Sequence, residues 1–208
     1  MLDAKLVDAL LAGDEKAFGV VVNRYNRAMI RLAMAYVPNR AVAEEVAQDA
    51  WLAMVQGLSG FKGQSSLKTW LFGILLNRAK TKGHRERRSV AFSTLQPPPG
   101  SRRSGKGDDW AVLRELICDR LAPAWGASKR NVSPEDRALG SELRLRLEEA
   151  IASLPPAQRA VIVLRDVEGW SSGEVCDLLG ITPENQRVRL HRARLRVRSA
   201  VETYLSRR

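Results

Sequence analysis

Cysteine and histidine are scarce in this chain of 208 residues, which holds two of each. Cys118 and Cys176 lie in apolar helical patterns without metal-ligand spacing, so we interpret them as small buried residues. His84 and His191 are too few for a zinc site or a His-based catalytic triad. We therefore expect no metal and no cofactor.

Long apolar runs are also missing, since no stretch approaches the roughly 20 residues that a membrane-spanning helix needs. Acidic residues interrupt the first apolar stretch, MLDAKLVDALLAGDEKAF, where a signal peptide does not tolerate them. We expect no membrane insertion and a cytoplasmic protein.

Aromatic residues make up only 6% of the chain and β-branched runs are few, which argues against a sheet-based enzyme fold. The frequent residues are helix formers such as Ala, Leu, Arg and Glu. The sequence therefore predicts an all-α protein. A partial phosphate-loop pattern at residues 100–107 has Gly107 where a metal-binding Ser or Thr is required, so we predict no nucleotide chemistry and no enzyme.

What the chain has in excess is positive charge, with 34 Lys and Arg against 23 Asp and Glu. Residues 77–106 hold nine Lys or Arg and one acid, and residues 183–198 hold six Arg and one acid. The remainder of the chain is close to balanced. Two separate basic segments indicate a polyanion that touches the protein twice, and nucleic acid is the leading candidate, because Lys and Arg near phosphates release counterions.

Composition divides the chain into two helical blocks with a linker between them. Residues 1–88 have helical periodicity interrupted by turn signals, which predicts a small bundle. Residues 89–136 are rich in Pro, Gly and Ser and are expected to form a linker, with a short helix at 109–121. A second run of helical sequence is expected to begin near Pro134, at the end of the linker, and residues 137–208 form the second block.

The second block ends in a predicted helix-turn-helix. Ser171 and Glu174 have the spacing of a capping box, Gly180 ends the first helix, and Thr182 with Pro183 begins a longer basic helix. Leu190, Ala193, Val197 and Val201 share the face expected to pack on the preceding helix. The opposite face is predicted to enter a major groove, with Arg and Asn reading bases and Val against a thymine methyl group. Its candidate residues are Glu184, Asn185, Arg187, Val188, Arg189, His191 and Arg192.

In the first block, residues 42–58 carry an apolar stripe on one helix face. The stripe consists of Ala43, Val46, Ala50, Trp51, Met54 and Leu58. The other face is acidic but includes Leu52, and an apolar residue there suggests a protein-binding surface. In the next helix, Leu67, Leu71, Ile74 and Arg78 are expected on one side and Phe72 and Leu76 on the other, with Trp70 and Phe72 in the core.

Both blocks resemble one family in the right order. Residues 147–194, LEEAIASLPPAQRAVIVLRDVEGWSSGEVCDLLGITPENQRVRLHRAR, resemble region 4 of bacterial sigma factors of the extracytoplasmic-function (ECF) class, and residues 41–88 resemble their region 2. The resemblance implies an RNA polymerase subunit whose region 4 reads the −35 promoter element and whose region 2 reads and opens the −10 element. Gln186 stands where the family often has an apolar residue, and Val188 stands where Ser is frequent.

The resemblance also implies partners and roles for further residues. Core RNA polymerase would bind through its β′ clamp helices and β flap, with Glu45, Gln48, Asp49 and Leu52 on the docking face. An anti-sigma protein is a further implied partner. Promoter DNA would be bound double-stranded at −35 and single-stranded at −10, where a loop holds a flipped base and a basic segment follows the strand. The −10 candidates are Phe61, Lys62, Gln64, Asn77, Arg78 and Lys80.

One alternative stays open at this point. A free-standing helix-turn-helix regulator would explain residues 171–198 without polymerase, but it would not explain the second basic segment or the resemblance of residues 41–88. An enzyme acting on nucleic acid is disfavoured because the sequence has no carboxylate cluster that could hold metal ions.

Overall fold

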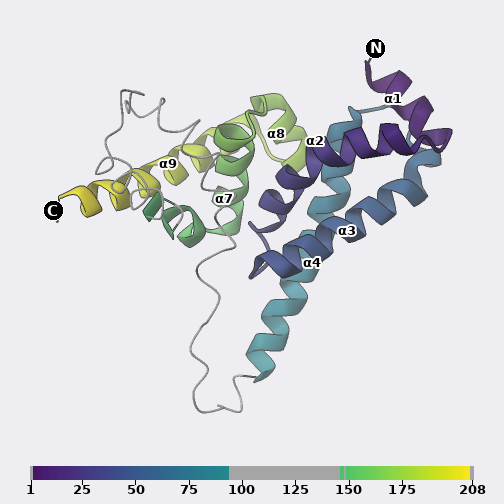
Figure 1. Ribbon diagram of the computed structural model, residues 1–208. Helices are drawn as coiled ribbons and strands as arrows, with labels where there is room; N and C mark the ends of the chain where they lie inside the picture. The colour runs from purple at the N-terminus through teal and green to yellow at the C-terminus, as the bar shows by residue number, and fades with distance from the viewer. Residues whose placement is uncertain (1, 94–145, 148, 207–208) are drawn as a thin grey trace, which may run out of the picture. The chain divides into compact units, whose positions relative to one another are not determined.

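The computed structural model describes residues 2–93, 146–147 and 149–206 (Figure 1). These residues form helices and the turns between them, without a strand among them, so the all-α prediction is confirmed. They fall into two compact units, divided between residues 104 and 105. The short helix predicted at 109–121 and the helix start predicted near Pro134 lie outside the described residues.

The amino-terminal unit is a bundle in which α3 packs against both α2 and α4, while α1 packs against α2. In Figure 1 these helices run from purple to teal. Their bounds are α1 Leu2–Leu11, α2 Glu15–Ala33, α3 Arg40–Gly57, the short 3-10 helix η1 Leu58–Gly60, and α4 Leu67–Ser93.

Short polar side chains begin three of these helices. The Asp14 carboxylate accepts hydrogen bonds from the amides of Lys16 and Ala17, and the Asn39 side chain accepts one from the amide of Val42. Ser66 does the same for the first turn of α4, since its hydroxyl accepts from the amide of Thr69 over 3.0 Å. Caps of this kind satisfy amides that have no partner within the helix, which fixes where each helix starts.

The predicted apolar stripe of α3 forms the centre of the bundle. All six of its residues are buried, and Trp51 also donates a hydrogen bond from Nε1 to Asn26 Oδ1 over 3.0 Å. In α4 the prediction is partly wrong: Phe72 is buried as expected, but Trp70 and Ile74 are only half-buried and Arg78 is exposed. The buried arc instead centres on Leu75 and Ala79, because α4 contacts α2 as well as α3 and so buries a wide arc of its surface.

Helix α4 also extends five residues beyond residue 88, where the first block was expected to end. No Pro or Gly lies between His84 and Ser93 to interrupt the helix. Earlier in α4, Gly83 is buried where the helix passes the turn that follows α2. A Cβ atom at this position would lie 2.3 Å from the carbonyl oxygen of Tyr36, so only glycine permits this approach.

In the carboxy-terminal unit, α9 packs more extensively against α7 than against α8. Leu190, Ala193 and Val197 of α9 are buried as predicted, and Val201 is half-buried. The elements are α7 Pro156–Ile162, the π-helical segment η2 Val163–Val167, α8 Ser172–Leu179 and α9 Pro183–Leu205, preceded by a helical turn within residues 149–152.

The capping hydrogen bonds and the glycine turn predicted for the helix-turn-helix are present in the structure. The Ser171 hydroxyl accepts from the amide of Glu174, and the Glu174 carboxylate accepts from the amide of Ser171. Gly180 ends α8 with φ +63°, a left-handed conformation that glycine adopts without strain. Thr182 then caps α9 through the amide of Asn185. These contacts set the turn between α8 and α9.

Candidate nucleic-acid interface

The first candidate surface is the exposed side of α9 near its amino-terminal end. Arg189 is half-buried and its Nε donates a hydrogen bond to Asn185 Oδ1 over 2.8 Å, so the two side chains form one unit. Val188 is 46% exposed, so its apolar side chain is open to a partner beside the arginines. The other predicted residues, all exposed, are Glu184, Asn185, Arg187, His191 and Arg192.

Glu184 is the single acid at this end of α9. Hydrogen bonds from its own backbone amide and from the Thr182 hydroxyl, with a smaller effect of the nearby Arg187 charge, lower the pKa of Glu184 below its usual value. The carboxylate therefore stays ionised and stabilises the start of the helix, where a negative charge is favourable. Its side chain is oriented toward the helix start, which leaves base contacts mainly to its neighbours.

Gln186 lies in the same helical turn but on the buried side of α9, where it is only 2% exposed. Its Oε1 accepts a hydrogen bond from the Ser172 hydroxyl of α8 over 3.2 Å. This bond joins the two helices of the motif at a position where the family often has an apolar residue. The amide oxygen is thus satisfied in that place, whereas the buried Nε2 of Gln186 has no hydrogen-bond partner among the described residues.

Several arginines of the basic segment 183–198 are engaged within the protein. Arg194 donates two hydrogen bonds to the Asp166 carboxylate, at 2.8 and 2.6 Å. Arg196 donates to Gln158 of α7 over 3.0 Å, and Arg198 pairs with Glu202 on its own helix. By charge alone, these three arginines belonged to the same basic segment as the arginines at the start of α9. The structure separates them from the residues at the start of α9.

The second candidate surface begins at the loop between η1 and α4. Lys62 and Gln64 are exposed there, and Gly63 between them has φ +66°. Phe61 is half-buried instead, with its ring centroid 5.0 Å from that of Trp70. The ring of Phe61 thus holds the loop on α4 and leaves Lys62 and Gln64 as its open polar groups.

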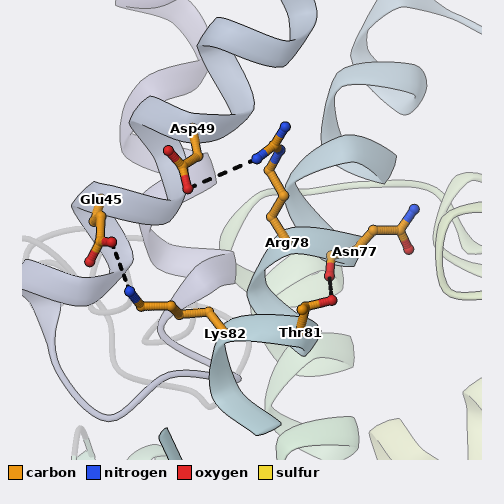
Figure 2. A network of polar contacts seen from close by, with 6 residues as sticks. All are labelled: Glu45, Asp49, Asn77, Arg78, Thr81 and Lys82. Carbon is orange, nitrogen blue, oxygen red and sulfur yellow. Dashed lines mark hydrogen bonds and ion pairs between the residues drawn. The ribbon is translucent and has the colours of Figure 1, made fainter. Parts of the chain in front are cut away.

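Along α4, the candidate residues Asn77, Arg78 and Lys80 are all exposed. Figure 2 shows the Asn77 side chain directed away from α3. The backbone carbonyl oxygen of Asn77 accepts a hydrogen bond from the Thr81 hydroxyl at 2.9 Å. Arg78 reaches toward Asp49 of α3, with 3.9 Å between the closest charged atoms. The basic surface of α4 therefore adjoins the acidic surface of α3.

That acidic surface is the candidate protein-binding face. Glu45, Gln48 and Asp49 are exposed, and Leu52 is 58% exposed. Val55, one turn further along α3, is 55% exposed and was missed from the sequence, although its spacing of three from Leu52 could have indicated it. The face combines two large apolar side chains with carboxylates and an amide, a composition suited to a protein partner.

The described residues offer little for other functions. No group of three or more His, Cys, Asp or Glu side chains within them could hold a metal ion. Nor is any described helix both long and apolar enough to cross a bilayer. What the described structure presents is a helical DNA-binding protein with one basic surface in each unit and an acidic, partly apolar surface beside one of them.

Comparison with known proteins identifies the family. Residues 21–89 match the model of sigma-70 region 2, and residues 144–197 match that of sigma-70, region 4. The chain is 30% identical to the ECF RNA polymerase sigma-E factor of Escherichia coli K12, over 100% of this chain and 98% of the relative. The chain belongs to the ECF class of RNA polymerase sigma factors.

Solved structures show the same fold at lower identity. One is CnrH in complex with the cytosolic domain of CnrY, with a TM-score of 0.59 and 21% identity, covering 98% of this chain and 99% of that chain. Another is the sigma factor RpoE in complex with the anti-sigma factor NepR from Bartonella quintana, with a TM-score of 0.60 and 19% identity, covering 90% and 98%. Sigma factors are transcription initiation factors rather than enzymes and act with core polymerase on promoter DNA. The family match in both units favours this function over a free-standing regulator.

Proposed function

We propose that the two basic surfaces of this sigma factor divide promoter recognition between them. The exposed start of α9 reads the −35 element in the major groove, through Asn185, Arg187, Val188, His191 and Arg192. The observation that supports this most directly is the exposure of these side chains together on a capped helix whose other face is buried.

The loop before α4 and the exposed face of α4 bind the −10 element as separated strands. Lys62 and Gln64 of the loop contact an unstacked base, while Asn77, Arg78 and Lys80 follow the backbone. Phe61 lies in the same loop, and its half-buried ring packs on Trp70 and positions the loop. Strand opening draws on binding free energy, because a captured base offsets an unstacking cost of a few kcal/mol, and no hydrolytic chemistry is needed.

The exposed face of α3 docks on core polymerase, at the β′ clamp helices, and the carboxy-terminal unit contacts the β flap. Leu52 and Val55 supply apolar area, and Glu45, Gln48 and Asp49 surround them with polar groups. Polymerase then holds the two units at the separation that the two promoter elements require. We expect the protein to work in the cytoplasm, and an anti-sigma partner, as in the two complexes above, to control it.

The test is permanganate footprinting of unpaired thymines, with and without core polymerase. The isolated chain is expected to bind promoter DNA weakly and to open none of it, whereas the holoenzyme gives reactive thymines in the −10 region. Leu52→Asp should abolish this gain, because it places a charge at the centre of the docking face. Val20→Asp is the matched control, since Val20 is 59% exposed on α2 of the same bundle. Strong binding of the isolated chain to a symmetric site would refute the proposal.

A further inference from the structure

Arg194 differs from the other arginines of α9 in how it is held. Both its Nε and its Nη2 donate to one carboxylate, that of Asp166, at 2.8 and 2.6 Å. The Asp166 side chain is only 7% exposed, whereas that of Arg194 is 49% exposed. Two parallel bonds fix the plane of the guanidinium as well as its distance, which a single contact does not. The pKa of Arg194 is raised, chiefly by the hydrogen bond to Asp166.

The acid stands on a segment that is itself well fixed. Asp166 lies in the π-helical turn η2, where the amide of Glu168 donates to the carbonyl of Val163 over 2.9 Å. Arg165, the residue before Asp166, donates a hydrogen bond from its guanidinium to the backbone carbonyl of Trp170. A carboxylate held on such a segment is a suitable anchor for another element.

The position of Arg194 around α9 separates it from Asn185 and Arg192, whereas Arg187, about two turns earlier, lies on the same side of the helix. At about 100° per residue, Arg194 lies roughly 160° around the helix from Arg192 and roughly 180° from Asn185. A guanidinium on that side, held by two bonds to Asp166, is directed away from the bases that Arg192 and Asn185 face. Its bonds to Asp166 do, however, fix the rotation of α9 about its own axis, and this rotation decides which side chains face the DNA.

We infer that Asp166 and Arg194 act as a positioning pair that sets the rotation of α9, so that Arg194 serves −35 recognition without contacting DNA. The inference rests on the proposed function of α9 and adds two residues to it. The competing possibility is that Arg194 is a phosphate contact that Asp166 merely shields. The two possibilities predict opposite changes in DNA affinity when Asp166 is replaced. Affinity falls if the pair positions α9, and it rises if Arg194 is a phosphate contact that Asp166 shields.

The experiment measures holoenzyme affinity for two promoter fragments, one with the intact −35 element and one with it scrambled. Asp166→Asn should weaken binding to the intact fragment by about three- to thirtyfold and leave the scrambled one unchanged. A phosphate contact would instead make Asp166→Asn bind both fragments more tightly. Arg194→Lys should lose as much as Asp166→Asn, because Lys cannot form the paired bonds; a phosphate contact would tolerate Lys.

Two further readouts separate positioning from a general structural role. The double variant Asp166→Asn with Arg194→Lys should lose no more than either single variant, since both break the same pair. The slope of log affinity against log salt should stay that of the wild type, whereas Lys80→Gln, which removes a proposed backbone contact of α4, should reduce it by about one. Arg198→Gln, which removes a pair within α9 alone, is the matched control and should leave −35 discrimination intact.

The outcomes also distinguish failure of this inference from failure of the proposed function. If the wild-type holoenzyme shows no dependence on the −35 sequence, the proposed function of α9 is wrong. If it shows that dependence and both single variants keep it, the positioning pair alone is refuted. Circular dichroism and thermal unfolding check each variant. If Asp166→Asn does not fold, Arg194→Lys decides the question, because its side chain is half exposed.

Discussion

Lys82 of α4 donates a hydrogen bond from Nζ to Glu45 Oε1 of α3 over 2.7 Å (Figure 2). This contact raises the pKa of Lys82, with a smaller opposing effect of desolvation. Together with Arg78 and Asp49, the pair joins the surface proposed to bind polymerase to the surface proposed to bind the −10 strand. The same acids thus face a protein partner on one side and the cations for DNA on the other.

Glu45→Gln is therefore expected to have opposite effects on the two partners. Affinity for core polymerase should fall, because a docking carboxylate is lost. Affinity of the isolated chain for single-stranded −10 DNA should rise slightly, because removal of this exposed ion pair frees Lys82 to contact phosphate. Fluorescence titrations with each partner measure both effects.

Glu44→Gln is the control, since Glu44 neighbours Glu45 in sequence but pairs with Arg40 within α3, at 2.7 Å. It should change neither affinity. A parallel fall of both affinities in Glu45→Gln would mean that the substitution damages the bundle, and the division of the two surfaces would then be wrong.

The close approach of Gly83 to the Tyr36 carbonyl predicts a sharp difference between two glycines of α4. Gly83→Ala should destabilise the amino-terminal unit by about 1–3 kcal/mol, because the new methyl group meets backbone rather than a flexible side chain. Gly73→Ala should stabilise it by about 0.5–1 kcal/mol, since nothing lies within 4 Å of its added Cβ and alanine favours helix. Amide hydrogen exchange of α2 to α4 in the full chain measures both. Equal behaviour of the two variants would contradict the packing described here.

The capping box of α8 leads to a third prediction. Ser171→Ala should reduce the stability of the carboxy-terminal unit by about 1 kcal/mol, because the Glu174 amide loses its acceptor. Ser199→Ala is the control: Ser199 is exposed within α9, where alanine is the better helix former. Hydrogen exchange of α8 reports the change. If Ser171→Ala were neutral, the capping box would not determine where α8 begins.

Features encoded by neighbouring residues were predictable from the sequence. The capping box at Ser171, the left-handed Gly180 and the cap at Thr182 each depend on residues within a few positions of one another, and the structure confirms them. The stripe of α3 was also predictable, because helical periodicity alone brings its residues to one face.

Features that depend on distant parts of the chain were not predictable in this way. The bond between Arg194 and Asp166 spans 28 positions, and that between Lys82 and Glu45 spans 37, so spacing gave no sign of either. The sequence predicted Phe61 as a DNA contact from its place in the loop and did not predict that its half-buried ring packs on Trp70. Packing against another aromatic ring fixes the position of Phe61, and the position of a residue in a loop does not reveal such a ring contact.

The last prediction concerns base reading by α9. Arg192→Ala and Asn185→Ala should each cost about 1–3 kcal/mol on the cognate −35 element and relax the preference at particular positions. Asn185→Ala also releases Arg189 from its 2.8 Å hydrogen bond, so its effect should spread to the bases that Arg189 can reach. Arg196 donates to Gln158 and lies beyond the exposed start of the helix, where we expect it to contact the DNA backbone rather than bases. Arg196→Ala should therefore weaken binding to all sequences alike. Holoenzyme binding to a library of −35 variants measures all three. A uniform loss in all of them would mean that the bases are read by another face of α9.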